Sequence, residues 1–196
     1  ATSAYVHEFL PATSDFDGTL ALKPYTIEIF KNVGSAYQVV DAQIHTLAIE
    51  MTAGAIVRAT ASVHGRAYNK VAKQTPSYIA ADHYTWNEAT INVAGAANNE
   101  IGAATITIAN PIEGIPLLNN SLNEGKIKRS GFRTVNITGD QDFSDQTQVG
   151  KFIAQERQRF LITVTGKAIG GSAEILTIDM PDVNYSTYTY PIAGAG

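Results

Sequence analysis

The chain has 196 residues, 44% of them hydrophobic, and a formal net charge of −4 at pH 7. This composition suits one compact domain over residues 1–196, whose hydrophobic core needs no disulfide or bound metal for stability. The absence of cysteine excludes disulfide frameworks, Cys-based zinc sites and thiol nucleophiles, and the 14 scattered Lys and Arg residues argue against a surface that binds DNA duplexes. No apolar run approaches the ~20 residues of a membrane-spanning helix, so no membrane is expected as a partner.

Apolar and polar residues alternate along most of the chain, which is the pattern of half-buried β-strands. The alternating segments are rich in β-branched residues and are separated by Gly, Asn, Asp and Pro. In chain order they are residues 25–30, 44–51, 56–64, 90–93, 105–108, 135–138, 160–165 and 175–178. This spacing predicts a mainly β fold with two packed antiparallel sheets, as a sandwich or a barrel.

The longest predicted hairpin joins residues 44–51 and 56–64 through a turn at Gly54. The register that makes one face continuously apolar pairs Leu47 with Val63, Ile49 with Ala61 and Met51 with Ala59. The opposite, wet face then carries Thr46, Ala48, Glu50, Thr52, Arg58, Thr60, Ser62 and His64. On this interpretation, lysine at position 59 or 61 would lie on a dry face and abolish soluble protein.

Later strands carry small neutral polar residues where an ordinary exposed sheet face would carry more charge. These residues are Thr90, Asn92, Thr105, Thr107, Thr134, Asn136, Thr138, Thr163 and Thr165. A solvent-filled channel that must not hold its cargo would explain this bias.

One segment, residues 142–157, breaks the β period and predicts a single flanking α-helix. Ser144 or Asp142 could cap its N-terminus, and Asp145 would lie favourably in its first turn. An apolar stripe is expected to dock the helix on the sheet through Val149, Phe152 and Ile153.

Two long stretches, residues 66–83 and 111–125, show no period and are predicted to be loops. Loops of this length in a compact domain usually have a function, and tyrosines favour a protein interface. The residues expected to make contacts there are Tyr68, Lys70, Lys73, Tyr78, Leu117 and Leu118.

No arrangement of residues indicates catalysis, a metal site or a cofactor. The histidines, at positions 7, 45, 64 and 83, lack metal-ligand spacing, and no Ser, His and Asp set or phosphate-binding glycine loop is recognisable. Residues 15–18 (Asp-Phe-Asp-Gly) are interpreted as a turn. The one basic cluster is interpreted as charge that guards a strand edge at Lys126, Lys128, Arg129 and Arg133. We therefore expect a protein that is not an enzyme.

The order of the segments along the chain is itself distinctive. A long hairpin is followed by two strands, a further strand, one late helix and a closing strand, at residues 44–51, 56–65, 86–95, 101–110, 129–133, 142–157, 176–181 and 183–185. In this order they resemble the tail tube proteins of bacteriophages, in particular those of long non-contractile tails. The resemblance spans roughly residues 25–185. Members often have a substantial segment before the equivalent of Tyr5, so the chain is either a short member or one whose segment is missing or cleaved.

The resemblance implies a structural virion protein that self-assembles into stacked, hexameric rings. The rings would form the hollow tail tube, through which phage DNA passes without sequence-specific binding. It also implies the tape-measure protein and the tail-tip and terminator proteins as partners, assembly in the host cytoplasm, and contacts between subunits at the two predicted loops. The residues expected to face the lumen are Glu50, Arg58, Thr60, Ser62, Thr134, Asn136 and Thr138.

Two alternatives remain open at this stage. A ring-forming tube protein of a related secretion or contractile injection system would share the fold, and its genome context would separate it. A monomeric β-sandwich that binds carbohydrate or mediates adhesion would need a cleft with clustered aromatics, and its support is Tyr185, Tyr188 and Tyr190.

Overall fold

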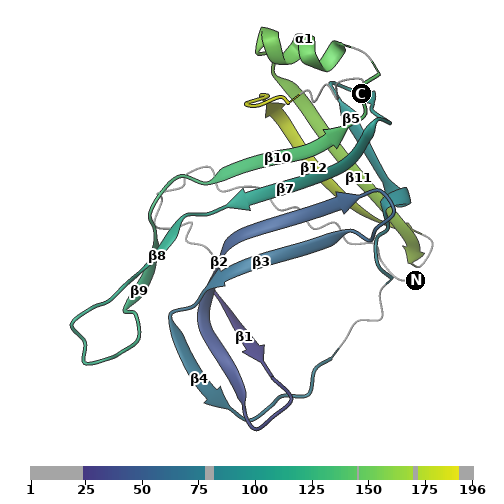
Figure 1. Cartoon of the computed structure of the whole chain (residues 1–196). Helices are drawn as coiled ribbons and strands as arrows, with labels where there is room; N and C mark the ends of the chain where they lie inside the picture. Colours follow the sequence, from purple (N-terminus) through teal and green to yellow (C-terminus); the bar gives the residue numbers. More distant parts are fainter. Residues whose placement is uncertain (1–23, 78–81, 145, 170–171, 190–196) are drawn as a thin grey trace, which may run out of the picture.

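The computed structural model describes residues 24–77, 82–144, 146–169 and 172–189 of the chain (Figure 1). Within these residues the fold is mainly β, with antiparallel sheets and one α-helix, which confirms the predicted fold class. The strands are β1 (Tyr25–Ile29), β2 (Ala36–Thr52), β3 (Arg58–His64), β4 (Ala67–Val71), β5 (Ala89–Val93), β6 (Ala96–Ala97), β7 (Ile101–Ala109), β8 (Ile112–Ile115), β9 (Lys126–Arg129), β10 (Thr134–Gln141), β11 (Gln158–Ile169) and β12 (Ser172–Val183). A short 3₁₀ helix, η2 (Trp86–Glu88), precedes β5, and the α-helix α1 (Thr147–Ala154) precedes β11.

The long strand β2 organises the larger sheet. Its first half pairs with β1 and β4, and its second half pairs with β3 and β7. Because β7 also pairs with β10, the second half belongs to a four-stranded antiparallel sheet in the order β3-β2-β7-β10, called sheet I below. The other large sheet, sheet II, has the order β12-β11-β5-β6, and β8 and β9 form a separate ribbon.

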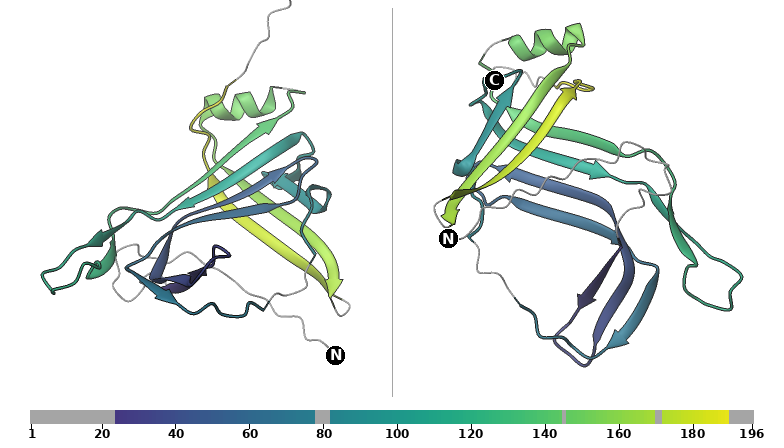
Figure 2. Two further views of the ribbon diagram at one scale, coloured as in Figure 1. Left: turned by 60° about the horizontal axis from the view of Figure 1, so that its bottom comes forward. Right: turned by 180° about the vertical axis from the view of Figure 1, so that it is seen from behind.

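The hydrophobic core lies between sheet I and sheet II, whose strands cross in the views of Figures 1 and 2. Alternation along each strand brings one side-chain face into this core. The buried residues of the core are Met51, Ala104 and Ile106 from sheet I, and Val93, Phe160, Ile162, Val164 and Met180 from sheet II. The core covers only one end of sheet I, because at the other end Val63 and Val135 remain 40% and 47% exposed.

Strand β2 has two local irregularities near its middle, and both alter its pairing. Asp41 has a left-handed backbone (φ 52°) beside a register shift in β1, and a second shift falls at His45 opposite β3. Such bulges bend a strand and re-aim its side chains. Opposite β2, Gly65 lies between β3 and β4. A larger residue would clash at this position, because a Cβ there would lie 1.9 Å from Cγ1 of Val39. The β1-β2-β4 arm therefore leaves sheet I at an angle (Figure 1).

The register of the long hairpin differs by two residues from the predicted one, which was wrong. Strands β2 and β3 pair Leu47 with Ala61 and Ile49 with Ala59. The cause is that residues 55–57 hydrogen-bond to residues 84–86 and so cannot extend the hairpin, for example through the Val57 N–H and the Tyr84 carbonyl at 2.9 Å. A shift of two residues keeps every side chain on its face, so the predicted division into a polar and an apolar face holds.

Helix α1 is shorter than the predicted span of residues 142–157, and its predicted caps are wrong. Its N-cap is Gln146, with no side-chain hydrogen bond. The Ser144 hydroxyl donates to Glu100 instead, and Asp142 accepts from the N–H of Phe143. Asp145 lies outside the described residues.

The helix packs chiefly on the segment that follows β12. The Phe152 ring stacks on Tyr188 with centroids 5.8 Å apart, and the Tyr185 hydroxyl donates to Gln148 at 2.9 Å. Burial raises the pKa of Tyr185, whose ring also contacts the core residue Phe160 edge-on. Ile153 of the predicted apolar stripe is 74% exposed, so only part of that stripe docks.

Both stretches that were predicted to be loops contain strands. Residues 67–71 form β4 because the β2 hairpin continues past Gly65, and residues 112–115 form β8 against β9. Beyond β4, the hydrogen bond from Lys167 of β11 at 2.6 Å lowers the pKa of Asp82 and ties that part of the chain to sheet II. What remains irregular in the second stretch is the connection at residues 116–125.

The core lies between sheets I and II and leaves one end of sheet I open, which gives a test of this fold with two valine substitutions, at Val164 of sheet II and Val63 of sheet I. Val164→Ala should lower the free energy of unfolding by about 2 kcal/mol, because a fully buried side chain loses two methyl groups and leaves a cavity. Val63→Ala should cost well under about 1 kcal/mol, because Val63 is 40% exposed. Urea unfolding of dilute protein measures both, and equal losses would contradict the placement of the core.

Candidate functional site

Sheet I has a polar face that is the strongest candidate for a functional surface. Directly paired residues in antiparallel strands point to the same side of a sheet, so the registers define its rows. The rows across β3, β2, β7 and β10 are Arg58–Glu50–Thr105–Thr138, then Thr60–Ala48–Thr107–Asn136, then Ser62–Thr46–Ala109–Thr134. The face is thus built from hydroxyls, one amide, alanine methyl groups and the oppositely charged Arg58 and Glu50, and its strands come from the β2-β3 hairpin and from β7 and β10 further along the chain.

The structure brings all seven residues that were expected to face a lumen onto this one polar face. They come from three strands, β2, β3 and β10, and are Glu50, Arg58, Thr60, Ser62, Thr134, Asn136 and Thr138. All are exposed except Glu50, which is half-buried. Whether the face lines a lumen is a separate question, taken up under Proposed function.

Four other polar residues that suggested a channel lie elsewhere. Thr90 and Asn92 of β5 pair with Thr163 and Leu161 of β11, in sheet II. Because Ile162 and Val164 point into the core, Thr163 and Thr165 point away from it, on the far side of sheet II. These residues therefore belong to a different surface from the polar face of sheet I.

The two edges of sheet I are exposed. Within the described residues, β3 pairs only with β2, and β10 pairs only with β7. Every residue of β3 from Arg58 to Val63 is exposed, including Ala59 and Ala61 on the apolar face. An exposed edge with an apolar face is a template for pairing with another chain.

The exposure of β3 corrects one expectation. Lysine in place of Ala59 or Ala61 was expected to abolish soluble protein because that face was expected to be dry. In the single chain neither side chain is buried, because sheet II covers only the other end of sheet I. A substitution there should therefore leave the folded monomer largely intact.

A second projecting element is the β8-β9 arm, which leaves the same end of sheet I as the β1-β2-β4 arm (Figures 1 and 2). The Glu124 carboxylate folds back over Gly114, where a Cβ would lie 1.8 Å from it, and meets Nε2 of His64 at 2.7 Å. This contact fixes the arm to the end of β3. At its tip, Leu118 and Leu122 are fully exposed.

Most residues expected at a protein interface lie on the two arms. Tyr68 is 61% exposed and stacks on Tyr37 across β4 and β2, with ring centroids 5.2 Å apart. Lys70 lies in β4 opposite Tyr37, and Lys73 places its ammonium 4.6 Å above the Phe30 ring. Leu117 and Leu118 lie at the tip of the β8-β9 arm. Tyr78 lies outside the described residues.

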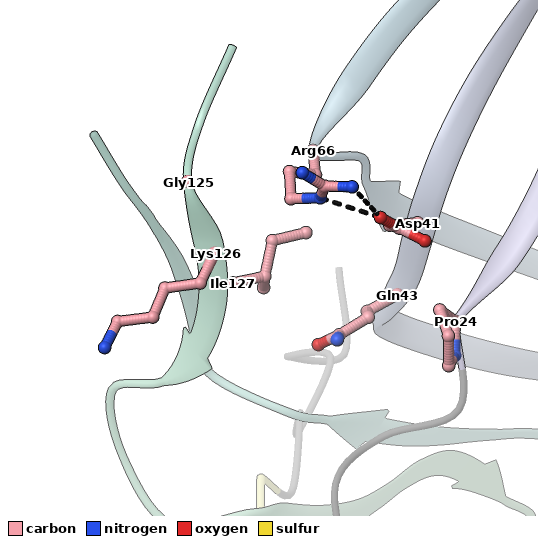
Figure 3. A pocket seen from close by; sticks show the side chains of 7 residues that line it. All are labelled: Pro24, Asp41, Gln43, Arg66, Gly125, Lys126 and Ile127. Atoms are coloured by element: carbon pink, nitrogen blue, oxygen red, sulfur yellow. Dashed lines mark hydrogen bonds and ion pairs between the residues drawn. The ribbon is translucent and has the colours of Figure 1, made fainter. Parts of the chain in front are cut away.

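A pocket of about 230 Å³ lies between the two arms (Figure 3). Its lining is Pro24, Asp41, Gln43, Arg66, Gly125, Lys126 and Ile127. Nε of Arg66 donates to the Asp41 carboxylate at 2.7 Å, and the Lys126 ammonium points away from this pair. The pair neutralises itself and joins β2 to the start of β4, so the pocket contains no free nucleophile or base.

Other kinds of site find no support in the described part of the chain. No group of three His, Asp or Glu side chains there could hold a metal ion. None of its helices is long and apolar enough to cross a membrane.

Comparison with known proteins decides the family. The sequence model of the phage tail tube protein family matches residues 2–194, nearly the whole chain. The chain belongs to the phage tail tube protein family. It has no significant match among curated proteins.

Membership makes the protein a structural component of the bacteriophage tail, in agreement with the resemblance drawn from the order of the sequence segments. It also gives the polar face, the open edges and the projecting arms a common context. Residues that sequence reasoning missed are those at the ends of β10, above all Asp140, whose place beside the polar face depends on the pairing of β10 with β7.

Two neighbouring residues of β7 test the division of sheet I into faces. Ala104→Lys should lower the free energy of unfolding by about 4 kcal/mol or more, because Ala104 is 3% exposed and a charge would enter the core. Thr105→Lys should be tolerated within about 1 kcal/mol, because Thr105 lies on the polar face. Thermal unfolding and soluble yield measure both, and a Thr105 variant as unstable as the Ala104 variant would refute the assignment.

Proposed function

We propose that this tail tube protein forms rings of about six copies, in which sheet I of each copy contributes to one continuous β-barrel. The rings stack into the tail tube, and the polar face of sheet I lines its lumen. The observation that carries the proposal is a neutral, hydroxyl-rich face on a sheet whose two edges are both open.

The composition of the polar face supports passage of DNA without retention. DNA is held by Lys and Arg side chains that replace its counterions. In the three rows of the polar face Arg58 is the only cation, and it lies directly opposite Glu50 on the next strand. Threonine, serine and asparagine hydrate the wall without fixing phosphates, so a polyanion can slide along it.

Barrel closure would resolve two exposed features of the single chain. It pairs the edges of β3 and β10, which otherwise invite uncontrolled association, and it covers the exposed end of the apolar face. With four strands from each of about six copies, spaced about 4.8 Å apart, the barrel would measure roughly 40–50 Å across its backbone, the value depending on the strand tilt. Half that number of copies would leave little room once side chains fill the interior.

The two arms supply contacts with further copies. Both leave the same end of sheet I, the β1-β2-β4 arm at an angle to its strands, and in a ring this end would lie toward the neighbouring ring (Figure 1). The apolar tip at Leu117, Leu118 and Leu122 and the exposed Tyr68 are the residues assigned to these contacts.

The finer assignments extend the resemblance of the sequence segments to the tail tube proteins of long non-contractile tails. We place the protein in the long-tailed, non-contractile type, with the tape-measure protein inside the tube and the tail-tip and terminator proteins at its ends. Assembly takes place in the host cytoplasm.

Assembly can be tested with light scattering after size exclusion and with negative-stain imaging. The unaltered protein should give rings or hollow filaments. Ala61→Lys should give a folded monomer that does not assemble, because lysine would enter the apolar face that assembly covers.

Thr60→Lys is the matched control, since Thr60 neighbours Ala61 in β3 but lies on the polar face. It should fold and assemble with a positively charged lumen. A chain that remains monomeric at high concentration and in the presence of tail-tip complexes would refute the ring.

A further inference from the structure

Opposite charges stand on the two open edges of sheet I, at the same end of the sheet. Arg58 begins β3, and Asp140 lies near the end of β10. In the rows of the polar face, Arg58 shares a row with Thr138. Asp140 lies one row further toward that end, with Thr52 and Ala103. Both charged side chains are exposed.

Among the described residues, neither Arg58 nor Asp140 has an ion-pair partner. Arg58 and Asp140 lie at opposite edges of four strands, roughly 14 Å apart at three strand spacings, which is beyond the reach of an ion pair. In the described structure no salt bridge within 4 Å joins Arg58 to Glu50, its cross-strand neighbour, and Asp140 has no ion-pair partner either. The two edges are therefore complementary in charge and separated in space.

The direction of the strands determines how a second copy can join. The strands of sheet I alternate in direction, so β10 of one copy beside β3 of the next continues the antiparallel pattern. This join is head-to-tail and can be repeated around a ring. Pairing β3 with β3 or β10 with β10 would close a two-fold dimer and bring no opposite charges together.

The possible registers of this join are few. An odd shift would move every apolar side chain to the polar face, so only even shifts are allowed. A shift of zero places Thr138 opposite Arg58 of the neighbour, but strands in a closed barrel must tilt, which requires a net shift. A shift of two residues places either Asp140 or Asn136 opposite Arg58, and only the first pairs opposite charges. A shift of four places opposite Arg58 either Thr134 or a position beyond Gln141, where β10 ends.

We infer, on the basis of the proposed ring, that Arg58 of one copy pairs with Asp140 of the next copy. This ion pair sets the register between subunits. The partner is a second copy of this chain, and the contact is an ion pair on the rim of the polar face. It excludes the wrong register, because a misplaced Arg58 would face a threonine or an asparagine. It also leaves no uncompensated cation on the lumen wall, which suits a wall that must not hold DNA.

The chain contains no cysteine, so paired cysteines report the register directly. If Asp140 lies opposite Arg58 of the next copy, the same antiparallel register places Thr138 opposite Thr60. The variant Thr60→Cys with Thr138→Cys keeps the ion pair and, assembled and then oxidised, should give a ladder of disulfide-linked copies on a non-reducing gel. Directly opposite residues lie about 4.5–5.5 Å apart between Cα atoms, within disulfide range. The matched variants Thr60→Cys with Asn136→Cys and Thr60→Cys with Thr134→Cys report the other two registers. They should give no ladder, because these positions lie two and four residues from the one opposite Thr60, about 7 Å or more away.

Charge reversal tests the role of the ion pair. Arg58→Glu and Asp140→Lys should each abolish assembly at a concentration at which the unaltered protein is fully assembled, and the double variant should restore it. Arg159→Glu, on the side of sheet II that faces away from the core, changes net charge as Arg58→Glu does, loses only an exposed ion pair and should assemble normally. Circular dichroism of each variant verifies that it is folded.

The outcomes separate this inference from the ring itself. A ladder with Asn136→Cys or Thr134→Cys in place of Thr138→Cys would overturn the register and leave the ring standing. Single reversals that assemble normally, or a double variant that stays monomeric although folded, would overturn the ion pair. Unaltered protein that forms no ring would overturn both proposals.

Discussion

The packing of sheet I on sheet II is the contact on which the rest of this structure depends. Ile106 of β7, with Ile162 and Val164 of β11, is fully or almost fully buried in the shared core. Because side chains alternate strictly along a strand, burying one face of β7 commits its other face to solvent. Because β2 and β10 pair with β7, and β3 pairs with β2, the side chains of these strands are divided between the same two faces. The polar face is thus a consequence of the core rather than a separate feature.

The same contact also explains what the fold leaves exposed. Sheet II crosses sheet I at one end, so the apolar face remains open toward Val63 and Val135. A monomer with an exposed apolar face and two open edges carries an aggregation hazard unless a partner covers them. Membership of a tail tube family makes other copies of the chain the natural partner.

Much of the fold and of the candidate site could be predicted from the sequence, because alternation reports faces directly. A two-residue error in the hairpin register did not move a single side chain across sheet I. Alternation does not report where a strand bends or which strands pair. The bulges at Asp41 and His45 depend on backbone geometry, and β4 and β8 are short strands held by distant partners. For the same reason the sequence showed Thr163 and Thr105 as equivalent, although they lie in different sheets.

The distribution of charge on sheet I can be understood from two opposing requirements. A wall that a polyanion must pass should hold few cations, whereas an edge that must find one partner in one register gains specificity from charge. Placing the lone cation of the polar face on β3, at the edge rather than in the middle, meets both requirements. Its positive charge is then available to a neighbouring copy and would be neutralised once that copy binds. In the proposed ring, a central lysine on β7 would instead remain on the lumen wall, where no edge of another subunit could reach it.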